Sequence, residues 1–582
     1  MIQMIGMRLI ATSLLILPLL ADAGQAVETS PTHREANVVQ AIGLVRYFHP
    51  HETTEVVDWN DVIMKGFDLA DADTSDAEFS IGLANLLKGF GNGIERIESD
   101  TEAGHPGVVK CGSDDPEVRW VHLGFDASPV DQSRVAFDVF TSRRSVSGIV
   151  DEDAASEDAP DYAEIELVDG STLQIPMVLC QTQTELTDAR REELESRSTP
   201  DPIDTMSPPS LARLDVAVLW PVVRNFYPYQ ELVEDWTGIL HHALDGSRSV
   251  SDRQDHRRLL QTMLVPLEDG HVNVIDLNAD ERGSLPVALQ PVAEELVVAN
   301  VRDDLKAKPG DLVLSIDGEP ADEWIDRKRG YYSGSPQWRT RWAGIELLVG
   351  PRAATRTLVL NRGGEAVGVN LRHEADDLLK SRSHASLEEV TDGIIYVDLT
   401  TIESSEIDRI IPRLDEARGA VFDMRGSPKA PVHELVRHLM DGPDDWMGWT
   451  QVLLARGPDG DLVVAKRSEW EMEAATPRIS APVVFLADEN AISYMESILG
   501  LVKYHGMATI VGSNTAGSNG NIVPLALPGE FRVNYTGMRV IGPDGEPYQG
   551  RGIEPDIRVY PTIEGLRAGR DELLERALEL LD

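Results

Sequence analysis

Apolar residues return at steps of three and four in two stretches of the chain, and the two stretches read alike. The shared segments are VVQAIGLVRYFHP (38–50), DWNDVI (58–63) and IGLANLLKGFGNGI (81–94), then VAVLWPVVRNFYP (216–228), DWTGIL (235–240) and LLQTMLVPLEDGH (259–271). This spacing predicts amphipathic helices, and the repetition predicts one helical module present twice. The copies end differently. The second ends in Asp269, Gly270 and His271 and the first in Asn92, Gly93 and Ile94, so any chemistry of that histidine occurs only once.

Alternating polar and apolar residues predict β-strands between and after the two copies. Between them, residues 104–195 are expected to form a β domain from VRWVHLGF (118–125), SRVAFDVF (133–140), YAEIELV (162–168) and LQIPMVL (173–179). The acidic stretch 151–161 is expected to be a loop, and the polar, proline-rich segment 196–210 a linker. Residues 285–375 are again strand-rich.

The last 198 or so residues alternate between apolar strand segments and helical segments. The expected strands are GIIYVDLT (393–400), AVFDMRG (420–426), APVVFLAD (481–488) and ATIVGS (508–513), with helices between them. Such alternation predicts an α/β unit around a largely parallel sheet. A length of 582 residues also exceeds one ordinary hydrophobic core, so the fold class is multidomain α/β.

The net charge, the N-terminal segment and the two cysteines indicate which partners are disfavoured and in which compartment the protein is expected. The net charge of -45 repels phosphate backbones and anionic lipids, which disfavours nucleic-acid binding and peripheral attachment to membranes. Arg8, the apolar run 9–20 and the small residues that follow predict a signal peptide over 1–26, with an uncleaved anchor as the alternative. We therefore expect a periplasmic or secreted protein without a membrane span after cleavage. Cys111 and Cys180, the only cysteines, are expected to form one disulfide; two free thiols are the alternative.

Ser493 is the first candidate for chemistry. It follows the apolar strand APVVFLAD in the segment ENAISYMESILG (489–500), at the beginning of an amphipathic helix. Backbone N–H groups and the helix dipole favour a developing oxyanion at that place. A serine that merely caps the helix is the alternative.

Four motifs in order around Ser493 resemble the tail-specific, or C-terminal processing, peptidases of serine peptidase family 41. Ser493 stands three residues before Glu496, GSNTAGSNGN (512–521) follows the helix, FDMRGSP (422–428) precedes it, and a closing Gly-Ile-x-Pro-Asp occupies 552–556. KPGDLVLSIDGEP (308–320) resembles the core of a PDZ domain, which binds a peptide as an added strand. The resemblance implies a crotonase-like (ClpP/crotonase) catalytic domain with a PDZ-like domain before it.

The departures from the family pattern indicate which base activates the serine. The family's dyad lysine would stand at Ser518, and no lysine occurs between 512 and 548. The chain instead resembles the branch related to the tricorn protease core, which implies His271 as the base. The glutamate that orients the histidine in that branch has Gln549 as its nearest equivalent here, so Gln549→Glu is expected to preserve or raise activity.

The remaining implied site residues are the oxyanion donors Gly426 and Tyr494, with Asp269, Glu496 and Ser518 in support. The four aromatic residues Tyr331, Tyr332, Trp338 and Trp342 could line a peptide groove, but packing at a domain junction is the preferred interpretation. The sequence contains no HExxH motif, no phosphate-binding loop and no metal-ligand cluster, so no metal or cofactor is expected.

The expected organisation is a signal peptide (1–26), a first helical module (27–103), a β domain (104–195), a linker (196–210), a second helical module (211–284), a PDZ-like domain (285–375) and the catalytic domain (385–582). The expected function is hydrolysis of peptide bonds in a peptide or protein substrate, through an acyl-enzyme on Ser493 with His271 as base. A peptide-binding protein that keeps the fold without activity is the main alternative. Esterase or amidase action is a lesser one, and the oligomeric state stays open.

Overall fold

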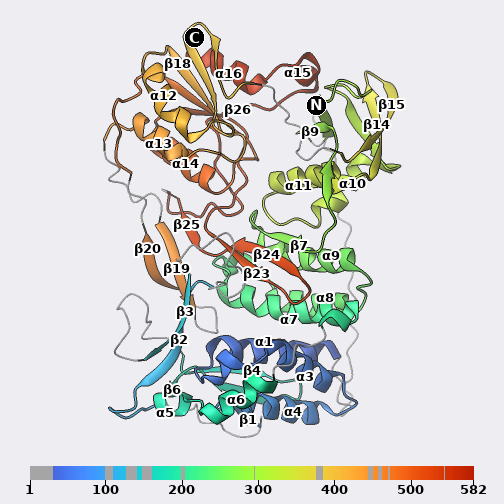
Figure 1. Ribbon diagram of the computed structural model, residues 1–582, viewed down its shortest axis with the longest axis vertical. Helices are drawn as coiled ribbons and strands as arrows, with labels where there is room; N and C mark the ends of the chain where they lie inside the picture. Colours follow the sequence, from blue (N-terminus) through green and yellow to red (C-terminus); the bar gives the residue numbers. More distant parts are fainter. Residues whose placement is uncertain are drawn as a thin grey trace, which may run out of the picture.

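The computed structural model describes residues 31–98, 109–125, 140–146, 160–197, 203–293, 295–374, 384–442, 450–456, 462–468, 472–542 and 544–582. The predicted signal peptide, nearly all of the acidic stretch 151–161 and most of the segment 133–140 lie outside the described residues. The molecule is elongated, with the first helical copy at one end, the second in the middle and two lobes at the other end (Figure 1). Within the described part, no helix is both long enough and apolar enough to cross a membrane.

The two helical copies have the same order of elements. The first contains α1 (Pro31–Phe48), α2 (Thr53–Val56), α3 (Trp59–Asp71), α4 (Asp76–Lys88) and β1 (Glu95–Ile97). The second contains α7 (Pro208–Phe226), the 3-10 helix η2 (Gln230–Leu232), α8 (Trp236–Ser247), α9 (Arg253–Leu264), the 3-10 helix η3 (Val265–Leu267) and β7 (Asn273–Asp276). Asp58 caps α3 and Asp235 caps α8, each accepting hydrogen bonds from backbone N–H groups of the first turn. Both copies thus consist of helices in a similar order, followed by one short strand.

The segment between the copies forms two small antiparallel sheets. Its elements are β2 (Glu117–Leu123), β3 (Thr141–Val146), β4 (Tyr162–Glu166), β5 (Thr172–Pro176), β6 (Leu179–Cys180), α5 (Gln181–Thr184) and α6 (Asp188–Arg197), with the 3-10 helix η1 (Ile203–Thr205) before α7. The sheet orders are β1-β5-β4 and β3-β2-β6. The single strand predicted over 173–179 is therefore two strands, because the chain leaves one sheet for the other after Pro176.

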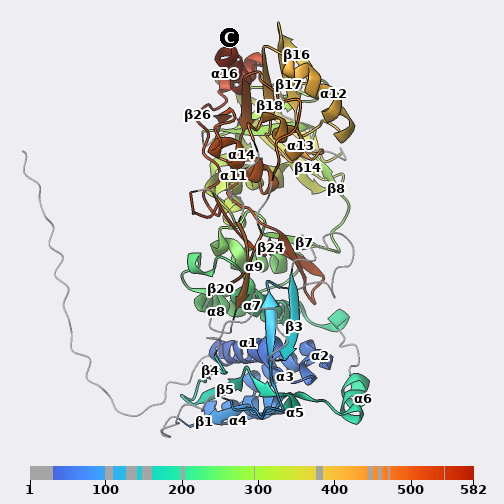
Figure 2. The same ribbon diagram turned by 90° about the vertical axis from the view of Figure 1, so that its left-hand side faces the viewer.

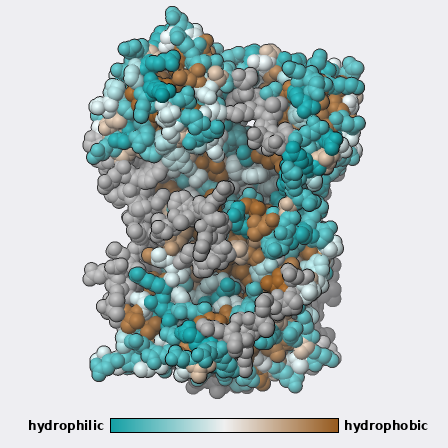
Figure 3. Space-filling view, viewed as in Figure 1, coloured by the Kyte–Doolittle hydropathy of each residue, from teal (hydrophilic) through white to brown (hydrophobic). Residues whose placement is uncertain are grey.

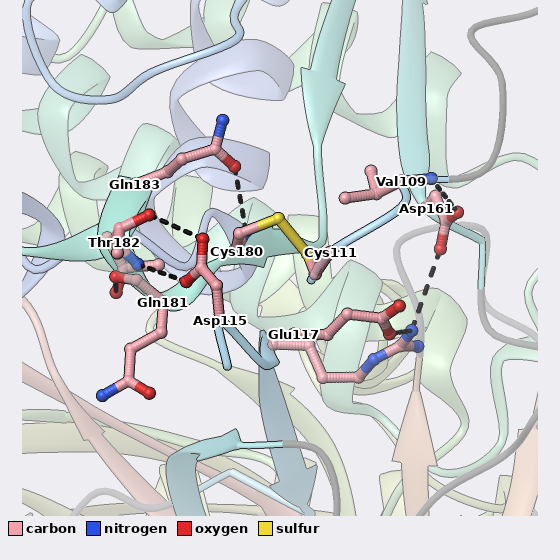
Figure 4. The surroundings of a disulfide bond; sticks show 11 residues. Val109, Cys111, Asp115, Glu117, Asp161, Cys180, Gln181, Thr182 and Gln183 are labelled. Carbon is pink, nitrogen blue, oxygen red and sulfur yellow. Dashed lines mark hydrogen bonds and ion pairs between the residues drawn. A yellow bond between two sulfur atoms is a disulfide. The ribbon is translucent and has the colours of Figure 1, made fainter. Parts of the chain in front are cut away.

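A disulfide joins Cys111 to Cys180, as predicted (Figure 4). It ties the segment before β2 to the end of β6. Beside it Thr182 donates to Asp115 through its backbone N–H (2.9 Å) and through its hydroxyl (2.7 Å). The disulfide therefore lies in the first half of the chain, among residues that belong to neither upper lobe.

A sheet in the order β15-β14-β11-β10-β9, with β12 beside β11, forms one upper lobe (Figure 1). The lobe contains β8 (Arg282–Ser284), β9 (Val287–Val292), β10 (Glu295–Val301), β11 (Leu312–Ile316), β12 (Glu319–Pro320), α10 (Ala321–Arg329), α11 (Pro336–Leu348), β13 (Val349–Pro351), β14 (Thr355–Arg362) and β15 (Glu365–Arg372). Asp317 and Gly318 have φ values of 50° and 88°, which form the tight turn between β11 and β12. Strand β9 lies at the edge of this sheet, beside α11.

The other upper lobe is built on a sheet in the order β16-β17-β18-β21-β22-β26. Its elements are β16 (Leu387–Thr391), β17 (Ile394–Asp398), α12 (Ser404–Asp415), β18 (Gly419–Asp423), α13 (Val432–Val436), the 3-10 helix η4 (Arg437–Leu439), β21 (Val483–Ala487), α14 (Tyr494–Tyr504), β22 (Thr509–Gly512), β26 (Ile557–Arg558), α15 (Ile563–Ala568) and α16 (Glu572–Leu581). All neighbouring strands are parallel except β16 and β17. Helices α12, α13 and α14 cover one face and α16 the other. The predicted, largely parallel α/β unit is confirmed.

Two hairpins extend from this lobe towards the middle of the molecule (Figures 1 and 2). They are β19 (Thr450–Arg456) with β20 (Leu462–Ser468), and β23 (Ile522–Ala526) with β24 (Phe531–Thr536). Strand β25 (Arg539–Ile541) pairs with β19, and β24 pairs with β7 of the second helical copy. The second pairing brings the end of the helical copy, with His271, against residues of the C-terminal lobe.

Candidate active site

Ser493 lies in a strained turn between β21 and α14. Its backbone has φ 60° and ψ -117°, a region that residues other than glycine rarely adopt. The serine nucleophile of many hydrolases lies on such a sharp turn between a strand and a helix, because the turn lifts the hydroxyl away from the backbone. The conformation distinguishes Ser493 from an ordinary helix-capping serine, which has extended backbone angles.

The buried carboxylate of Glu496 holds this turn in place through hydrogen bonds. Its carboxylate is fully buried and accepts four hydrogen bonds, from the backbone N–H groups of Ser493 (3.1 Å), Gly517 (2.7 Å) and Ser518 (3.0 Å) and from the Thr515 hydroxyl (2.6 Å). Burial raises the pKa of Glu496 to about 7, although the four donors oppose that shift. The spacing of three residues between Ser493 and Glu496 therefore has a physical role: it lets Glu496 connect the serine turn to the glycine segment 512–521.

Asp269 and Thr536 hold His271 on its Nδ1 side. The buried Asp269 carboxylate accepts from the backbone N–H of His271 (2.9 Å), from the Thr536 backbone N–H (2.7 Å) and from the Thr536 hydroxyl (2.8 Å). The Thr536 oxygen also lies 2.8 Å from His271 Nδ1. Because the single hydroxyl proton of Thr536 goes to the carboxylate, the Thr536 oxygen accepts from His271 Nδ1–H. The lone pair of the neutral imidazole is then on Nε2, as a general base requires.

His271 Nε2 is buried and has no hydrogen-bond partner. The Ser493 hydroxyl therefore forms no hydrogen bond with His271 Nε2 in this structure. Desolvation lowers the pKa of His271 below its ordinary value, with Asp269 opposing the shift. The ring is thus kept neutral.

Ser518 connects the two turns. Its hydroxyl accepts from Gly270 N–H (2.5 Å), its carbonyl oxygen accepts from Ser493 N–H (3.0 Å), and the residue is fully buried. A Cβ on Gly270 would lie only 3.0 Å from Ser518 Oγ and from Trp338 Nε1, and Trp338 donates to the Gly270 carbonyl oxygen (3.0 Å). A lysine in place of Ser518 would have to displace this packed turn. The same contacts place Trp338 at a junction between lobes, which agrees with the preferred interpretation of the aromatic residues.

Gln549 contacts residues other than the imidazole. Its amide nitrogen donates to Tyr227 OH (3.1 Å) and to the Glu268 carbonyl oxygen (3.0 Å), and its amide oxygen is buried without a partner. The group that contacts His271 Nδ1 is the hydroxyl of Thr536. Sequence reasoning missed Thr536, since a threonine in a short strand gives no signal until β24 is paired with β7.

The loop after β18 directs its polar groups into its own interior. Gly426 N–H donates to the Met424 carbonyl oxygen (2.9 Å), with φ at 151°. The Arg425 guanidinium is buried and bonds to Asp423 (2.6 Å) and to Asp571 (2.7 Å), the residue that caps α16. The arginine of this motif thus ties the loop to the C-terminal helix. In this arrangement the Gly426 N–H is not directed at an oxyanion, in contrast to the expectation from the sequence.

A pocket of about 400 Å³ lies between the two upper lobes. Residues 288–291 of β9 and Gly344, Ile345 and Leu348 of α11 line one side, and 488–490 and Arg425 line the other. Figure 3 shows the surface hollowed between these lobes, with apolar side chains within the hollow. Ser493 and His271 are not among the residues that line the pocket. Among the described residues, no group of three or more His, Cys, Asp or Glu side chains is arranged to hold a metal ion.

The geometry defines a class of site, a serine on a strained turn between strand and helix that is joined through Ser518 to the turn of a histidine, and known proteins are similar to part of the chain. Residues 393–559 match the model of peptidase family S41. The chain is 26% identical over 229 residues to a probable CtpA-like serine protease of Staphylococcus aureus (strain N315), covering 37% of this chain and 44% of that protein. It is 23% identical over 290 residues to a carboxy-terminal-processing protease of Bartonella bacilliformis, covering 48% and 61%. The matched region spans less than half of the first of these relatives.

Solved structures agree at the level of the fold. Mature CPAF superposes with a TM-score of 0.53 at 15% identity, over 64% of this chain and 96% of that one. These matches confirm the resemblance predicted from the sequence motifs: residues 393–559 are similar to peptidase family S41, and the chain is similar to C-terminal processing proteases.

Proposed function

We propose that this chain is an exported serine peptidase that hydrolyses peptide bonds through an acyl-enzyme on Ser493, with His271 as the general base. The observation that carries the proposal is the connection of two turns through Ser518. One turn presents a serine in a strained conformation, and the other presents an imidazole whose Nε2 is unprotonated. Hydrogen bonds of catalytic groups are often long before substrate binds, so the missing bond between Ser493 and His271 is compatible with catalysis.

The proposed reaction has two halves, acylation and deacylation, and Ser493 and His271 take part in both. Ser493 Oγ attacks the carbonyl carbon of the scissile bond while His271 Nε2 takes the hydroxyl proton. The imidazolium then gives that proton to the leaving amine, and the acyl group stays on the serine. Water then attacks the acyl carbon and loses a proton to Nε2, and the imidazolium returns that proton to Ser493 Oγ as the bond between the acyl group and the serine breaks and the acid leaves. While His271 is protonated, its Nδ1–H donates to the Thr536 hydroxyl oxygen, and that hydroxyl donates to Asp269. The Asp269 charge thus stabilises the imidazolium through Thr536.

We assign oxyanion stabilisation to the backbone N–H of Tyr494, the first residue of α14. It follows Ser493 directly, at the positive end of the helix dipole. Gly426 would contribute only after its N–H leaves the Met424 carbonyl oxygen. A substrate that reorients the Gly426 peptide bond would complete the oxyanion site. We therefore expect this loop to rearrange when substrate binds.

The substrate is proposed to be an extended peptide or protein segment. Among the residues that the structure describes, β9 is an edge strand of its sheet and lies beside α11, and the 400 Å³ pocket is lined by both. A peptide could add to this edge as a strand, as the resemblance of 308–320 to a PDZ core implies. We propose a PDZ-like lobe over 285–375 and a crotonase-like catalytic lobe over 385–582, and we expect export because 1–26 has the pattern of a signal peptide.

A fluorophosphonate probe and a peptide hydrolysis assay test the proposal together. Wild-type protein should become labelled on Ser493 and cleave an unstructured protein substrate, and Ser493→Ala should do neither. Labelling on another residue would move the nucleophile. A lack of labelling together with tight peptide binding would favour the second candidate, a peptide-binding protein without activity. The Gly426 N–H turned into its own loop and the missing bond between His271 and Ser493 are the observations that favour that candidate.

A further inference from the structure

The internal repeat extends beyond the helices into the β elements. In the C-terminal half, hairpin β23–β24 pairs with β7, and hairpin β19–β20 pairs with β25. In the first half, hairpin β4–β5 pairs with β1, and hairpin β2–β3 pairs with β6. In both halves the last short strand follows the helix-docked hairpin after two residues: β6 follows β5, and β25 follows β24. Residues 31–197 thus reproduce, without the α/β lobe, the arrangement of strands and helices that surrounds His271.

The two copies pack as the two subunits of a symmetric dimer do. Equivalent residues 178 positions apart touch one another: Glu35 bonds to Arg213 (2.7 Å), and the Phe48 and Phe226 rings stack with centroids 6.1 Å apart. Gly43 and its equivalent Pro221 also meet, since a Cβ on Gly43 would lie 2.5 Å from Pro221 Cβ. Contacts between a position and its own equivalent are the signature of an isologous interface, generated by a two-fold axis.

The secondary contacts obey the same symmetry. Helix α1 packs on α8 as α7 packs on α3, and β2 packs on β19, its own equivalent. Figures 1 and 2 show β2 and β3 reaching from the lower part of the molecule towards β19 and β20. Glu35 is fully buried and bonds to Arg248 (2.7 Å) as well as to Arg213, so the charges of this interface are paired within one chain.

The first half also contacts the residue next to Thr536. Gly537 follows Thr536 at the end of β24, and a Cβ on Gly537 would lie 2.6 Å from Cζ of Phe140. Phe140 stands directly before β3 and also packs closely over Gly124, at the end of β2. The hydroxyl of Thr536 is the acceptor for His271 Nδ1–H. An aromatic ring of the first half therefore contacts the residue that directly follows Thr536, whose hydroxyl sets the tautomer of the histidine.

We infer that residues 31–197 are an internal, non-catalytic partner subunit, which occupies the surface that a second copy would occupy and whose Phe140 positions Thr536 and through it His271. The effect of Phe140 on catalysis rests on the proposed function. Its effect on the position of Thr536 and His271 does not. Two consequences follow. The protein works as a monomer, and a small change in the first half alters the imidazole.

The first test compares Phe140→Ala with Phe125→Ala. Both residues are aromatic and belong to the first half. The Phe125 ring packs on Tyr47 and Phe226, whereas the Phe140 ring is the one that contacts Gly537, so Phe125→Ala serves as the matched control. Nitrogen-15 NMR reads the tautomer of His271 directly. We expect Phe140→Ala to add the Nε2–H tautomer to a signal that is otherwise Nδ1–H, to lower kcat about tenfold with KM within twofold, and to shift the acid limb of the pH profile. Phe125→Ala should leave the tautomer and the limb unchanged.

The outcomes separate the two hypotheses. A changed tautomer without any change in hydrolysis would keep the positioning and remove His271 from catalysis. An unchanged tautomer in a folded Phe140→Ala protein would overturn the positioning, even if activity fell. If Phe140→Ala does not fold, Phe140→Leu, which keeps an apolar contact of smaller reach, gives the same comparison.

The second test measures molar mass by light scattering and sedimentation over a wide range of protein concentration. We expect the mass of one chain throughout, because the self-complementary surface is occupied within the molecule. A stable homodimer in the wild-type protein would overturn the assignment of the first half as a substitute for a partner copy.

Discussion

The turns that end the two helical copies are built alike and differ in chemistry. In the first copy the His49 ring nitrogen bonds to the Asn92 carbonyl oxygen (3.0 Å), and Ile94 enters the core. In the second copy Tyr227, the equivalent of His49, donates to the Leu267 carbonyl oxygen (2.8 Å), and His271 follows the turn. Burial lowers the pKa of His49 to about 4, so that this histidine is a neutral structural group.

The difference shows which parts of the fold supply position and which supply chemistry. In both copies a helix end with an aromatic ring fixes a glycine turn, and a strand then leaves the turn to pair with a hairpin. Only the second hairpin brings a hydroxyl and meets a buried aspartate at the turn. The helix end, the glycine turn and the strand that follows it are thus present twice, whereas the candidate active site is present once.

The largest expected effect comes from Ser493, the proposed nucleophile, whose proposed base His271 follows the turn of the second copy only. Ser493→Ala should lower peptide hydrolysis by at least about 10⁴-fold, because the acyl-enzyme cannot form. The half-buried side chain contributes little to packing, so the thermal midpoint should change little. Rates of hydrolysis and a melting curve of the same preparation measure both. Residual turnover within tenfold of wild type would assign activity elsewhere.

The next effect tests the two turns directly. His271→Ala should lower turnover at least about a hundredfold, and Ile94→Ala should affect stability but not the chemical step. Wild-type activity should rise with pH along a limb below about 6.5, because burial lowers the pKa of His271 and the base is active when unprotonated. A limb above about pH 8.5 would indicate a lysine instead, with Lys429 or Lys503 as candidates.

Thr536→Val should have an intermediate effect. The substitution keeps the shape and removes the acceptor for His271 Nδ1–H, so we expect turnover about tenfold lower and a displaced pH limb. Thr536→Ser keeps the hydroxyl and should restore most of the activity. Equal losses in both variants would mean that the methyl group, and not the hydrogen bond, is what matters.

The smallest effect is expected for Gln549→Glu. The sequence favoured preserved or raised activity, but the structure gives a reason for a loss. A carboxylate there would face the Glu268 carbonyl oxygen and a Tyr227 oxygen whose proton goes to Leu267, with no donor for it. We expect turnover a few-fold lower and a free energy of unfolding lower by about 1–3 kcal/mol, as measured by urea titration. Raised activity would restore Gln549 as the partner of the imidazole.

Local patterns in the sequence were enough for several parts of the molecule. Helical periodicity and its repetition predicted both copies, and the apolar runs predicted the parallel strands, because burial on two faces leaves few polar positions. The apolar strand segment 481–488 and the amphipathic helix after it predicted the turn that joins β21 to α14 and carries Ser493. The expected export of the chain and the place of both cysteines in one region predicted the disulfide.

The sequence by itself therefore determined the elements, the α/β class and the two residues that we propose for catalysis. Tertiary structure alone decided their partners. Thr536 lies 265 residues from His271, and no local pattern encodes a bond over that separation. The inward hydrogen bonds of Gly426 and Gln549, and the contact of Phe140 with Gly537, likewise depend on how distant segments pack. Periodicity reports which face of an element is buried, whereas the group that a buried atom meets is fixed only when all segments are in place.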